Sequence, residues 1–253
     1  MSGILVLLRH GQSTWNELNL FTGWHDVPLT PRGVAEATAA GTTMAAEGLT
    51  FDEAHTSLLT RAIETNRLAL AAMGASDIPV HRDWRLNERH YGALQGLDKK
   101  ETTARHGEPQ TTLWRRSFDV PPPPVESTSP EHPLNDPTYQ RLVRDGLDPS
   151  LLPATECLKD VLERILPYWH DVIRPRLRQG AHVLVTAHGN SLRALIMHLE
   201  NISSADISEF NVPTGVPRRY EFTSEMSVAN VGYLGDPQAI AAATDAVARQ
   251  ASK

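Results

Sequence analysis

The sequence predicts an α/β protein with a mostly parallel central sheet flanked by helices. Two apolar runs, residues 4–8 and 182–187, are typical of buried strands, and each ends in His-Gly-x-Ser. Helical patterns lie between these strands, as in chains that alternate strand and helix. The 253 residues, 40% of them hydrophobic, suit one large α/β domain, with any further segment carried as an insertion.

The two strand ends predict one shared site. The first run delivers Arg9, His10 and Gly11, and the second delivers His188 and Gly189. Parallel strands open their carboxyl ends into one crevice, so we expect the two histidines to face each other. A lone histidine is more often an ordinary core or loop residue. The repeated strand-to-histidine junction favours the site.

The first half of the chain reads as alternating elements. Residues 14–18 predict a short helix whose backbone N–H groups form an anion site. Thr30 and Pro31 predict an N-cap and first turn of a helix reaching about Ala46. Strands are expected at 51–57 and 78–81, with an Ala- and Leu-rich helix between them.

Two charged residues in this half are candidates for catalysis. Arg61 lies near a helix N-terminus above a strand end, where its charge suits an anion; a solvated arginine is the alternative. Glu88 is the one carboxylate in residues 84–96, a stretch dense in cations, aromatics and glycine. It is the natural general acid or base, and a surface ion pair is the alternative.

The middle of the chain predicts a lid. A short helix begins at Lys99 and ends by Gly107, and residues 107–154 that follow are rich in proline, with four in succession from Pro121. Such a stretch is not expected to form a regular core element. Arg115 and Arg116 favour a lid over the site, and a polyproline stretch that binds a partner is the alternative.

The C-terminal half returns to regular elements. Apolar residues repeat at helical spacing over 156–178, with Thr155 as the expected cap and Pro167 and Pro175 dividing the helix. A helix over 191–199, strands near 220–222 and 231–234, and a partly helical, mobile tail from Pro237 complete the prediction.

Composition excludes several classes of protein. The net charge of -6 argues against nucleic acid or an acidic membrane as partner. No apolar run reaches membrane-spanning length and no basic leader is present, so a cytosolic protein is expected. The one cysteine, Cys157, cannot form an internal disulfide and has no histidine at the offset of a catalytic thiol.

The candidate residues together point to phosphoryl transfer. Histidine, cysteine and carboxylate residues show no metal-ligand spacing, whereas only four of the 24 Lys+Arg residues are lysine, leaving arginine, which suits phosphate. A neutral His10 can attack phosphorus, while Glu88 protonates the leaving oxygen. Arg9, Arg61 and His188 would stabilise the developing charge. The further cations Lys99, Arg115 and Arg116 imply a substrate with a second anionic group.

Motifs over about residues 3–235 give the chain a family resemblance. Leu8-Arg9-His10-Gly11 with the distant His188-Gly189 is similar to the histidine phosphatase, or phosphoglycerate mutase, superfamily. Further stretches resemble its cofactor-dependent phosphoglycerate mutases: residues 21–24, 56–62, 86–96, 114–116, 188–194 and 213–217.

The resemblance implies a three-layer αβα, phosphoglycerate mutase-like domain over 1–236, with a lid-like insertion at 107–154 and a flexible Ala-rich tail at 237–253. It implies interconversion of 3- and 2-phosphoglycerate in glycolysis and gluconeogenesis, without metal and primed by 2,3-bisphosphoglycerate. The nucleophile would be His10, the proton donor Glu88 and the transition-state partner His188. The implied substrate binders are Arg9, Asn16, Thr22, Gly23, Arg61, Glu88, Tyr91, Lys99, Arg115, Arg116, Gly189 and Asn190. Phosphoglycerates are the expected partners, and a homo-oligomer is expected, with a dimer favoured.

Departures and alternatives remain open at this point. Gln12 replaces a glutamate usual in the family, so altered affinity with intact chemistry is expected. The insertion after Pro124 and the tail also differ from the bacterial pattern. A phosphatase or a bisphosphoglycerate synthase of the same superfamily is the alternative enzyme, and a silent phospholigand-binding protein is the alternative outside enzymes.

Overall fold

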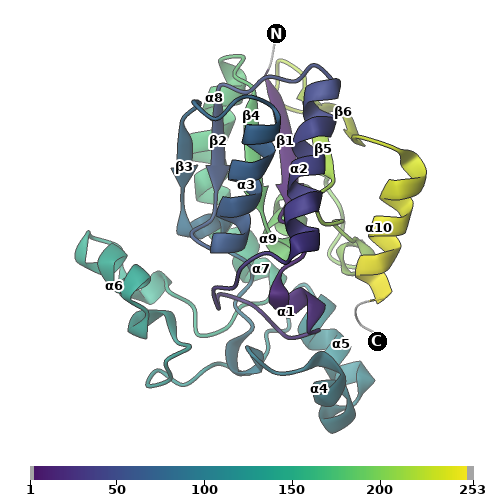
Figure 1. The fold of residues 1–253 in the computed structure, drawn as a ribbon. Helices are drawn as coiled ribbons and strands as arrows, with labels where there is room; N and C mark the ends of the chain where they lie inside the picture. The colour runs from purple at the N-terminus through teal and green to yellow at the C-terminus, as the bar shows by residue number, and fades with distance from the viewer. Residues whose placement is uncertain (1–2, 250–253) are drawn as a thin grey trace.

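The protein is built on one six-stranded sheet. The computed structural model describes residues 3–249, and Figure 1 shows the sheet with the strand order β3-β2-β4-β1-β5-β6. The strands are β1 (Ile4–Arg9), β2 (Glu53–Thr56), β3 (Val80–Arg82), β4 (Val183–Ala187), β5 (Pro217–Phe222) and β6 (Val228–Tyr233).

The central pair of strands brings the two histidine junctions together. β1 and β4 are parallel and in register, with Arg9 opposite Ala187. The backbone N–H of His10 donates to the carbonyl of Ala187 at 3.0 Å. β2 and β3 continue the parallel part, whereas β5 and β6 are antiparallel. The predicted mostly parallel sheet is therefore confirmed.

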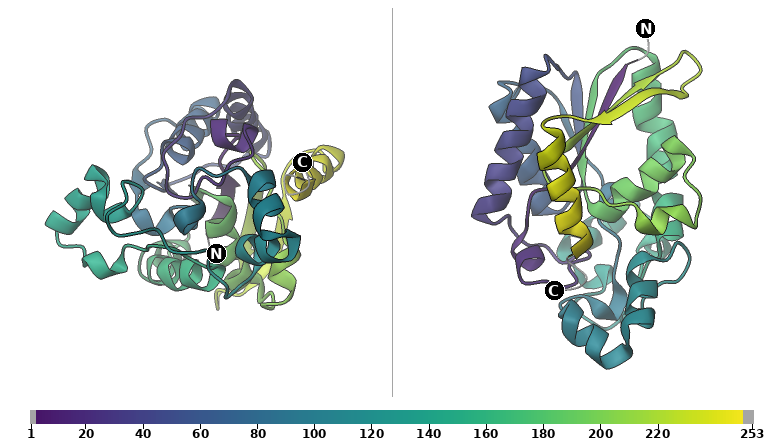
Figure 2. Two further views of the ribbon diagram at one scale, coloured as in Figure 1. Left: turned by 90° about the horizontal axis from the view of Figure 1, so that it is seen from below. Right: turned by 90° about the vertical axis from the view of Figure 1, so that its right-hand side faces the viewer.

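Helices cover both faces of this sheet. α2 (Pro31–Ala46) and α3 (Thr60–Ala72) lie on one face, and α7 (Leu158–Tyr168), α8 (Arg174–Arg178) and α9 (Gly189–Glu200) lie on the other, as the right-hand view of Figure 2 shows. Side chains alternate along β1: Val6 and Leu8 pack under α2 and α3, and Leu5 and Leu7 pack on the opposite side. The three-layer αβα prediction is confirmed.

Local signals explain where several helices begin. The Thr30 hydroxyl accepts from the N–H of Gly33 at 3.1 Å, and Pro31 opens α2, as predicted. α7 begins at Leu158 with Cys157 at its N-cap, so the predicted cap at Thr155 is wrong. The Thr155 hydroxyl instead donates to the Pro122 carbonyl at 2.8 Å.

The prolines divide the long C-terminal helix as expected. α7 passes at Tyr168 into a wider π-helical turn over Trp169–Ile173, and α8 follows with Pro175 in its first turn. Pro167, inside α7, has no N–H for the helical ladder, which favours such a local change of winding. α9 begins at Gly189, two residues earlier than predicted, so its first turn directly follows His188.

The segment after Leu94 lies beyond the carboxyl ends of the parallel strands, together with α1 (Thr14–Glu17) (Figure 1). It contains α4 (Lys99–His106), α5 (Glu108–Arg116) and α6 (Pro137–Arg144). The expectation of no regular element in residues 107–154 is therefore wrong. Pro109 and Pro137 occupy first turns, where a missing N–H costs nothing.

The chain ends on a peripheral helix. α10 (Pro237–Arg249) has no buried residue and lies beside the body of the protein (Figures 1 and 2). The part of the predicted tail from 250 to 253 lies outside the described residues. Within residues 3–249 no helix is long and apolar enough to cross a membrane.

Candidate active site

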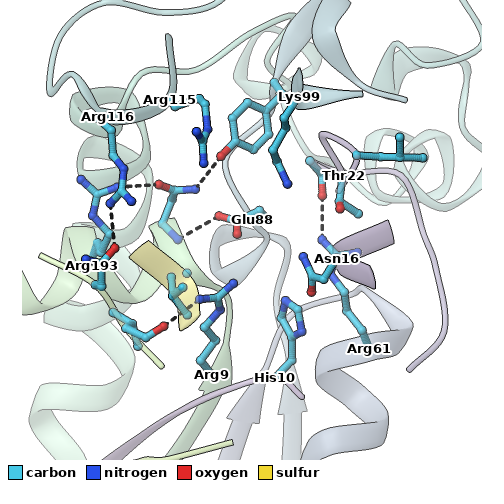
Figure 3. Close-up of a pocket in the computed structure, with 18 residues that line it drawn as sticks. Arg9, His10, Asn16, Thr22, Arg61, Glu88, Lys99, Arg115, Arg116 and Arg193 are labelled. Carbon is cyan, nitrogen blue, oxygen red and sulfur yellow. Dashed lines mark hydrogen bonds between the residues drawn. The ribbon is translucent and has the colours of Figure 1, made fainter. Parts of the chain in front are cut away.

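The pocket lies where β1 and β4 end, enclosed by α1, α3, α4, α5 and α9 (Figure 3). Polar and cationic side chains line most of it. The lining residues are Arg9, His10, Asn16, Leu20, Thr22, Gly23, Arg61, Glu88, Tyr91, Lys99, Arg115, Arg116, Gly189, Asn190, Arg193, Asn211, Val212 and Val247.

His10 is held as a neutral base. Its Nδ1 lies 2.7 Å from the carbonyl of Gly11, and because a carbonyl only accepts, Nδ1 carries the proton and donates. The lone pair is then on Nε2. Burial, followed by the charges of Arg61 and Arg9, lowers the pKa of His10 well below its usual value. The ring is therefore uncharged at neutral pH.

His188 packs directly against His10, behind the pocket wall. The ring centroids are 4.9 Å apart in an edge-to-face arrangement, and His188 is fully buried. Its Nε2 is 2.8 Å from the hydroxyl oxygen of Ser57. Burial and the charge of Arg61 lower its pKa well below the usual value, so this imidazole is also neutral.

Two buried guanidinium groups flank the histidines without neutralising carboxylates. Arg9 donates to the carbonyl of Val212 at 2.7 Å, and Arg61 donates to the carbonyls of Gly23 at 2.7 Å and His25 at 3.0 Å. Burial lowers the pKa of Arg61 to about 10, which leaves it charged at neutral pH. In residues 3–249 neither arginine forms an ion pair, so both charges are available to an anion.

Glu88 lies between the histidine end and the upper part of the pocket (Figure 3). One carboxyl oxygen, Oε1, accepts from the backbone N–H groups of Arg89 at 2.8 Å and Asn190 at 3.0 Å. These donors orient the carboxyl group, and Oε2 forms no hydrogen bond within the described residues. Glu88 is therefore not a surface ion pair but a buried carboxyl group inside the pocket.

A second group of cations lies at the far end of the pocket. Lys99, Arg115 and Arg116 are grouped away from His10 in Figure 3. Burial lowers the pKa of Lys99 to about 8. Burial alone would raise the pKa of Tyr91, but the charge of Arg89, with Lys99, lowers it to about 8. The pocket thus offers positive charge at two separated ends.

The start of α9 supplies further donors. The N–H of Asn190 is already bound to Glu88, and its side-chain amide donates to the Tyr91 hydroxyl at 3.2 Å. Gly189 allows close packing, because a Cβ there would lie 3.3 Å from the Arg9 guanidinium carbon. The helix dipole adds partial positive charge to this end.

Every candidate catalytic or substrate-binding residue named from the sequence lines this pocket except His188, which lies behind His10. The sequence analysis missed Leu20, Arg193, Asn211, Val212 and Val247. The sequence spacing could have indicated Arg193, because it lies one helical turn after Asn190. In the structure Arg193 donates to the amide oxygen of Asn190 at 3.0 Å. Gln12 does not line the pocket: its amide oxygen accepts from the Thr30 hydroxyl at 2.9 Å.

A family model decides what the chain is related to. The model of the histidine phosphatase superfamily (branch 1) matches residues 5–132 and 131–230. The chain belongs to this superfamily. A 2,3-bisphosphoglycerate-dependent phosphoglycerate mutase of Xylella fastidiosa (strain 9a5c) is 52% identical to it over 250 residues, 99% of this chain and 98% of the relative.

Solved structures of the histidine phosphatase fold superpose on the model. A phosphoglycerate mutase from Bacillus anthracis str. Sterne has a TM-score of 0.62 at 22% identity and covers 95% of this chain and 96% of its own. An alpha-ribazole phosphatase from Shigella flexneri has a TM-score of 0.65 at 21% identity, with 90% and 95% covered. At these identities the likeness shows the fold.

Within residues 3–249 the structure shows neither a metal-ligand cluster nor an exposed cysteine thiol. No group of three or more His, Cys, Asp or Glu residues within 3–249 is arranged to hold a metal ion. Burial raises the pKa of the Cys157 thiol to about 11, which keeps it an inert packing residue.

Proposed function

We propose that this chain interconverts 3-phosphoglycerate and 2-phosphoglycerate, as a cytoplasmic enzyme of glycolysis and gluconeogenesis. One observation carries the proposal, the arrangement of charge in the pocket. One end holds a neutral histidine and two arginines without an ion-pair partner in residues 3–249, the other end holds a second group of cations, and Glu88 lies between them. A phosphorylated sugar acid has two anionic groups, a phosphate and a carboxylate, one for each cationic end of the pocket. The 52% identical mutase of Xylella fastidiosa supports the same activity.

The residues divide the chemistry among them. His10 Nε2 attacks phosphorus in line, the new N–P bond forms, and the P–O bond to the glycerate breaks. Arg9, Arg61 and His188 stabilise the charge that spreads over the phosphoryl oxygens. Glu88 gives its proton to the departing oxygen and removes one from the hydroxyl that accepts the phosphoryl group.

The donor set also fits 2,3-bisphosphoglycerate. When bound, this compound supplies the phosphoryl group that first loads His10. Arg9, Arg61, Asn16, Thr22, Gly23 and Gly189 would hold one end, and Tyr91, Lys99, Arg115, Arg116 and Asn190 would hold the other. The buried Nε of Arg9 has no hydrogen-bond partner in the described structure, which suits an anion at that end.

Residues 1–236 form the proposed catalytic domain, in which the insertion at 107–154 excludes water and the tail from 237 covers the pocket mouth. Arg115 and Arg116 come from this insertion and Val247 from the tail, and all three line the pocket. Keeping water away from phosphohistidine is what separates a mutase from a phosphatase. A homodimer stays a prediction from the family resemblance.

The test follows 3-phosphoglycerate by phosphorus NMR in excess chelator, with and without a trace of 2,3-bisphosphoglycerate. The proposal expects a 2-phosphoglycerate signal that grows faster when the trace is present. Growth of inorganic phosphate alone would make the protein a phosphatase. Net accumulation of 2,3-bisphosphoglycerate when an acyl phosphate such as 1,3-bisphosphoglycerate is added as phosphoryl donor would make it a synthase.

A further inference from the structure

Glu88 is carried by a backbone segment outside the sheet. Residues 84–90 form a 3-10 turn over Trp84–Leu86 and then an irregular stretch, without a strand ladder to fix them. The position of the proposed acid therefore depends on what side chains do to this backbone.

One buried side chain collects the carbonyl groups of the segment. Arg164, on α7, donates from Nη1 to the carbonyls of Arg85 at 2.8 Å, Asn87 at 3.3 Å and Trp84 at 3.4 Å, and from Nη2 to the carbonyl of Glu88 at 3.3 Å. The residue is 9% exposed. Only the planar five-donor fork of arginine can serve this many acceptors at once.

Glu156 completes the arrangement from the other side. Its two carboxylate oxygens accept from Nε and Nη2 of Arg164 at 2.7 and 2.9 Å, and Oε2 also accepts from the N–H of His90 at 2.8 Å. The N–H of Glu156 donates to the His90 carbonyl at 2.9 Å. The ion pair thus forms hydrogen bonds to the backbone on both sides of Glu88.

We infer that Arg164, with Glu156 as its counter-ion, is a positioning residue that sets the place of the Glu88 carboxyl group relative to the leaving oxygen. The inference rests on the proposed function and deepens it. Neither residue lines the pocket, so neither touches the substrate. Their effect is transmitted through the backbone of Glu88 itself. A small displacement of a catalytic group lowers the rate strongly.

The choice of phosphoryl donor distinguishes this positioning role from a general contribution to the stability of the fold. When His10 attacks a phosphoglycerate, the electron pair of the broken P–O bond goes to an alkoxide oxygen, which needs the Glu88 proton. When His10 attacks 4-nitrophenyl phosphate, the pair goes to 4-nitrophenolate, a stable anion that leaves without a proton. Misplacing Glu88 slows the first reaction and spares the second.

The test compares loading of His10 by the two donors in Arg164→Lys. Lysine keeps the charge but lacks the fork, so the carbonyls of Arg85 and Asn87 lose their Arg164 donor. The Glu88 carbonyl loses it too and keeps only the indole N–H of Trp24, at 2.5 Å. Loading by 2,3-bisphosphoglycerate, in rapid-quench single turnover, should fall about 100-fold, the scale of general acid catalysis. The burst of 4-nitrophenolate, which precedes any water attack, should change less than about 3-fold.

A matched control is a half-buried bidentate pair, Arg218 with Glu200, on β5 and α9. Arg218→Lys should leave the ratio of the two loading rates unchanged. Should Arg164→Lys lose its thermal transition, Glu156→Gln provides a gentler loosening, because its amide oxygen still accepts from His90.

Equal slowing with both donors, or slowing with neither, would overturn the positioning role. Failure of the wild-type protein to load His10 from 2,3-bisphosphoglycerate would instead contradict the proposed function. The two failures are therefore distinguished by the wild-type measurement alone.

Discussion

At the scale of single residues, the proposed chemistry depends on one neutral imidazole. His10→Ala removes Nε2 from a site whose arginines are held by backbone carbonyls, so the two arginines keep their hydrogen bonds without this ring. We expect the isomerase rate to fall by about 10⁴-fold or more, since a nucleophile has no substitute. Phosphorus NMR measures the rate, and circular dichroism checks the fold. Appreciable activity in this variant would remove His10 from its assigned role.

Lys99 gives the site a pH dependence. Its pKa of about 8 in the pocket means that the charge is lost as the pH rises through this value. Affinity for 3-phosphoglycerate should therefore fall up to tenfold per pH unit above about 8, and Lys99→Arg should retain affinity there. Isothermal titration from pH 7 to 9.5 measures this.

Tyr91 is the competing explanation for such a pH dependence, because its pKa is also lowered to about 8 and its ionisation would add negative charge. If the loss of affinity persists in Lys99→Arg and disappears in Tyr91→Phe, the tyrosine is responsible. If the affinity of the wild type stays unchanged up to pH 9.5, both explanations are wrong.

Residues proposed to contact the substrate could be predicted from the sequence. Residues that position them through contacts within the protein could not. His10, Glu88 and Arg61 stand in short polar motifs beside strand or helix ends, which is a local signal. Arg164 lies in an amphipathic helix among apolar residues, 76 positions from Glu88 in the chain, and only the tertiary fold brings the two together. Val212 contributes its carbonyl, which no side-chain pattern reveals.

At the scale of elements, α10 lies on the outside of the molecule. None of its residues is buried, yet Val247 lines both the active-site pocket and the adjoining pocket beside α1 and α2. Removing residues 237–253 should raise hydrolysis relative to isomerisation about 10-fold, because water gains access to phosphohistidine. The melting temperature should change little.

Point variants of α10 separate shielding from mere presence of the helix. Val247→Ser should reproduce part of the effect, and Ala242→Ser, on an exposed part of the same helix, should not. The ratio of inorganic phosphate to 2-phosphoglycerate, read by phosphorus NMR, measures shielding. An unchanged ratio after truncation would show that the insertion excludes water without the tail.

Elements with local start signals were predicted well, and those defined by distant contacts were not. Thr30 and Pro31 fix the start of α2 through bonds within one turn. The hydroxyl of Thr155 has the same capping ability but is used by the Pro122 carbonyl, 33 positions away. The proline-rich segment contains helices that its proline content does not predict, because Pro109 and Pro137 stand in the first turns of α5 and α6, where proline is tolerated.

At the scale of the whole molecule, the fold buries several neutral histidines. β1 beside β4 places His10 against His188, and burial also lowers the pKa of His90, to about 3. In the unfolded chain these side chains titrate near pH 6.5. Below that pH the unfolded state binds protons that the folded state does not bind. This difference persists until the pH reaches the lowered pKa values of these histidines in the folded state.

Stability should therefore fall as the pH drops below about 6.5, by up to about 1.4 kcal/mol per pH unit for each such histidine. Acidic residues also titrate in this range, so the slope of the wild type alone is not decisive. The informative comparison is His10→Ala, which removes one of the buried imidazoles. Urea unfolding at pH 7.5, 6.5, 5.5 and 5.0 should give this variant a shallower slope, by about one proton. Parallel slopes for the two proteins would mean that His10 is protonated in the folded state, and so is no nucleophile at those pH values.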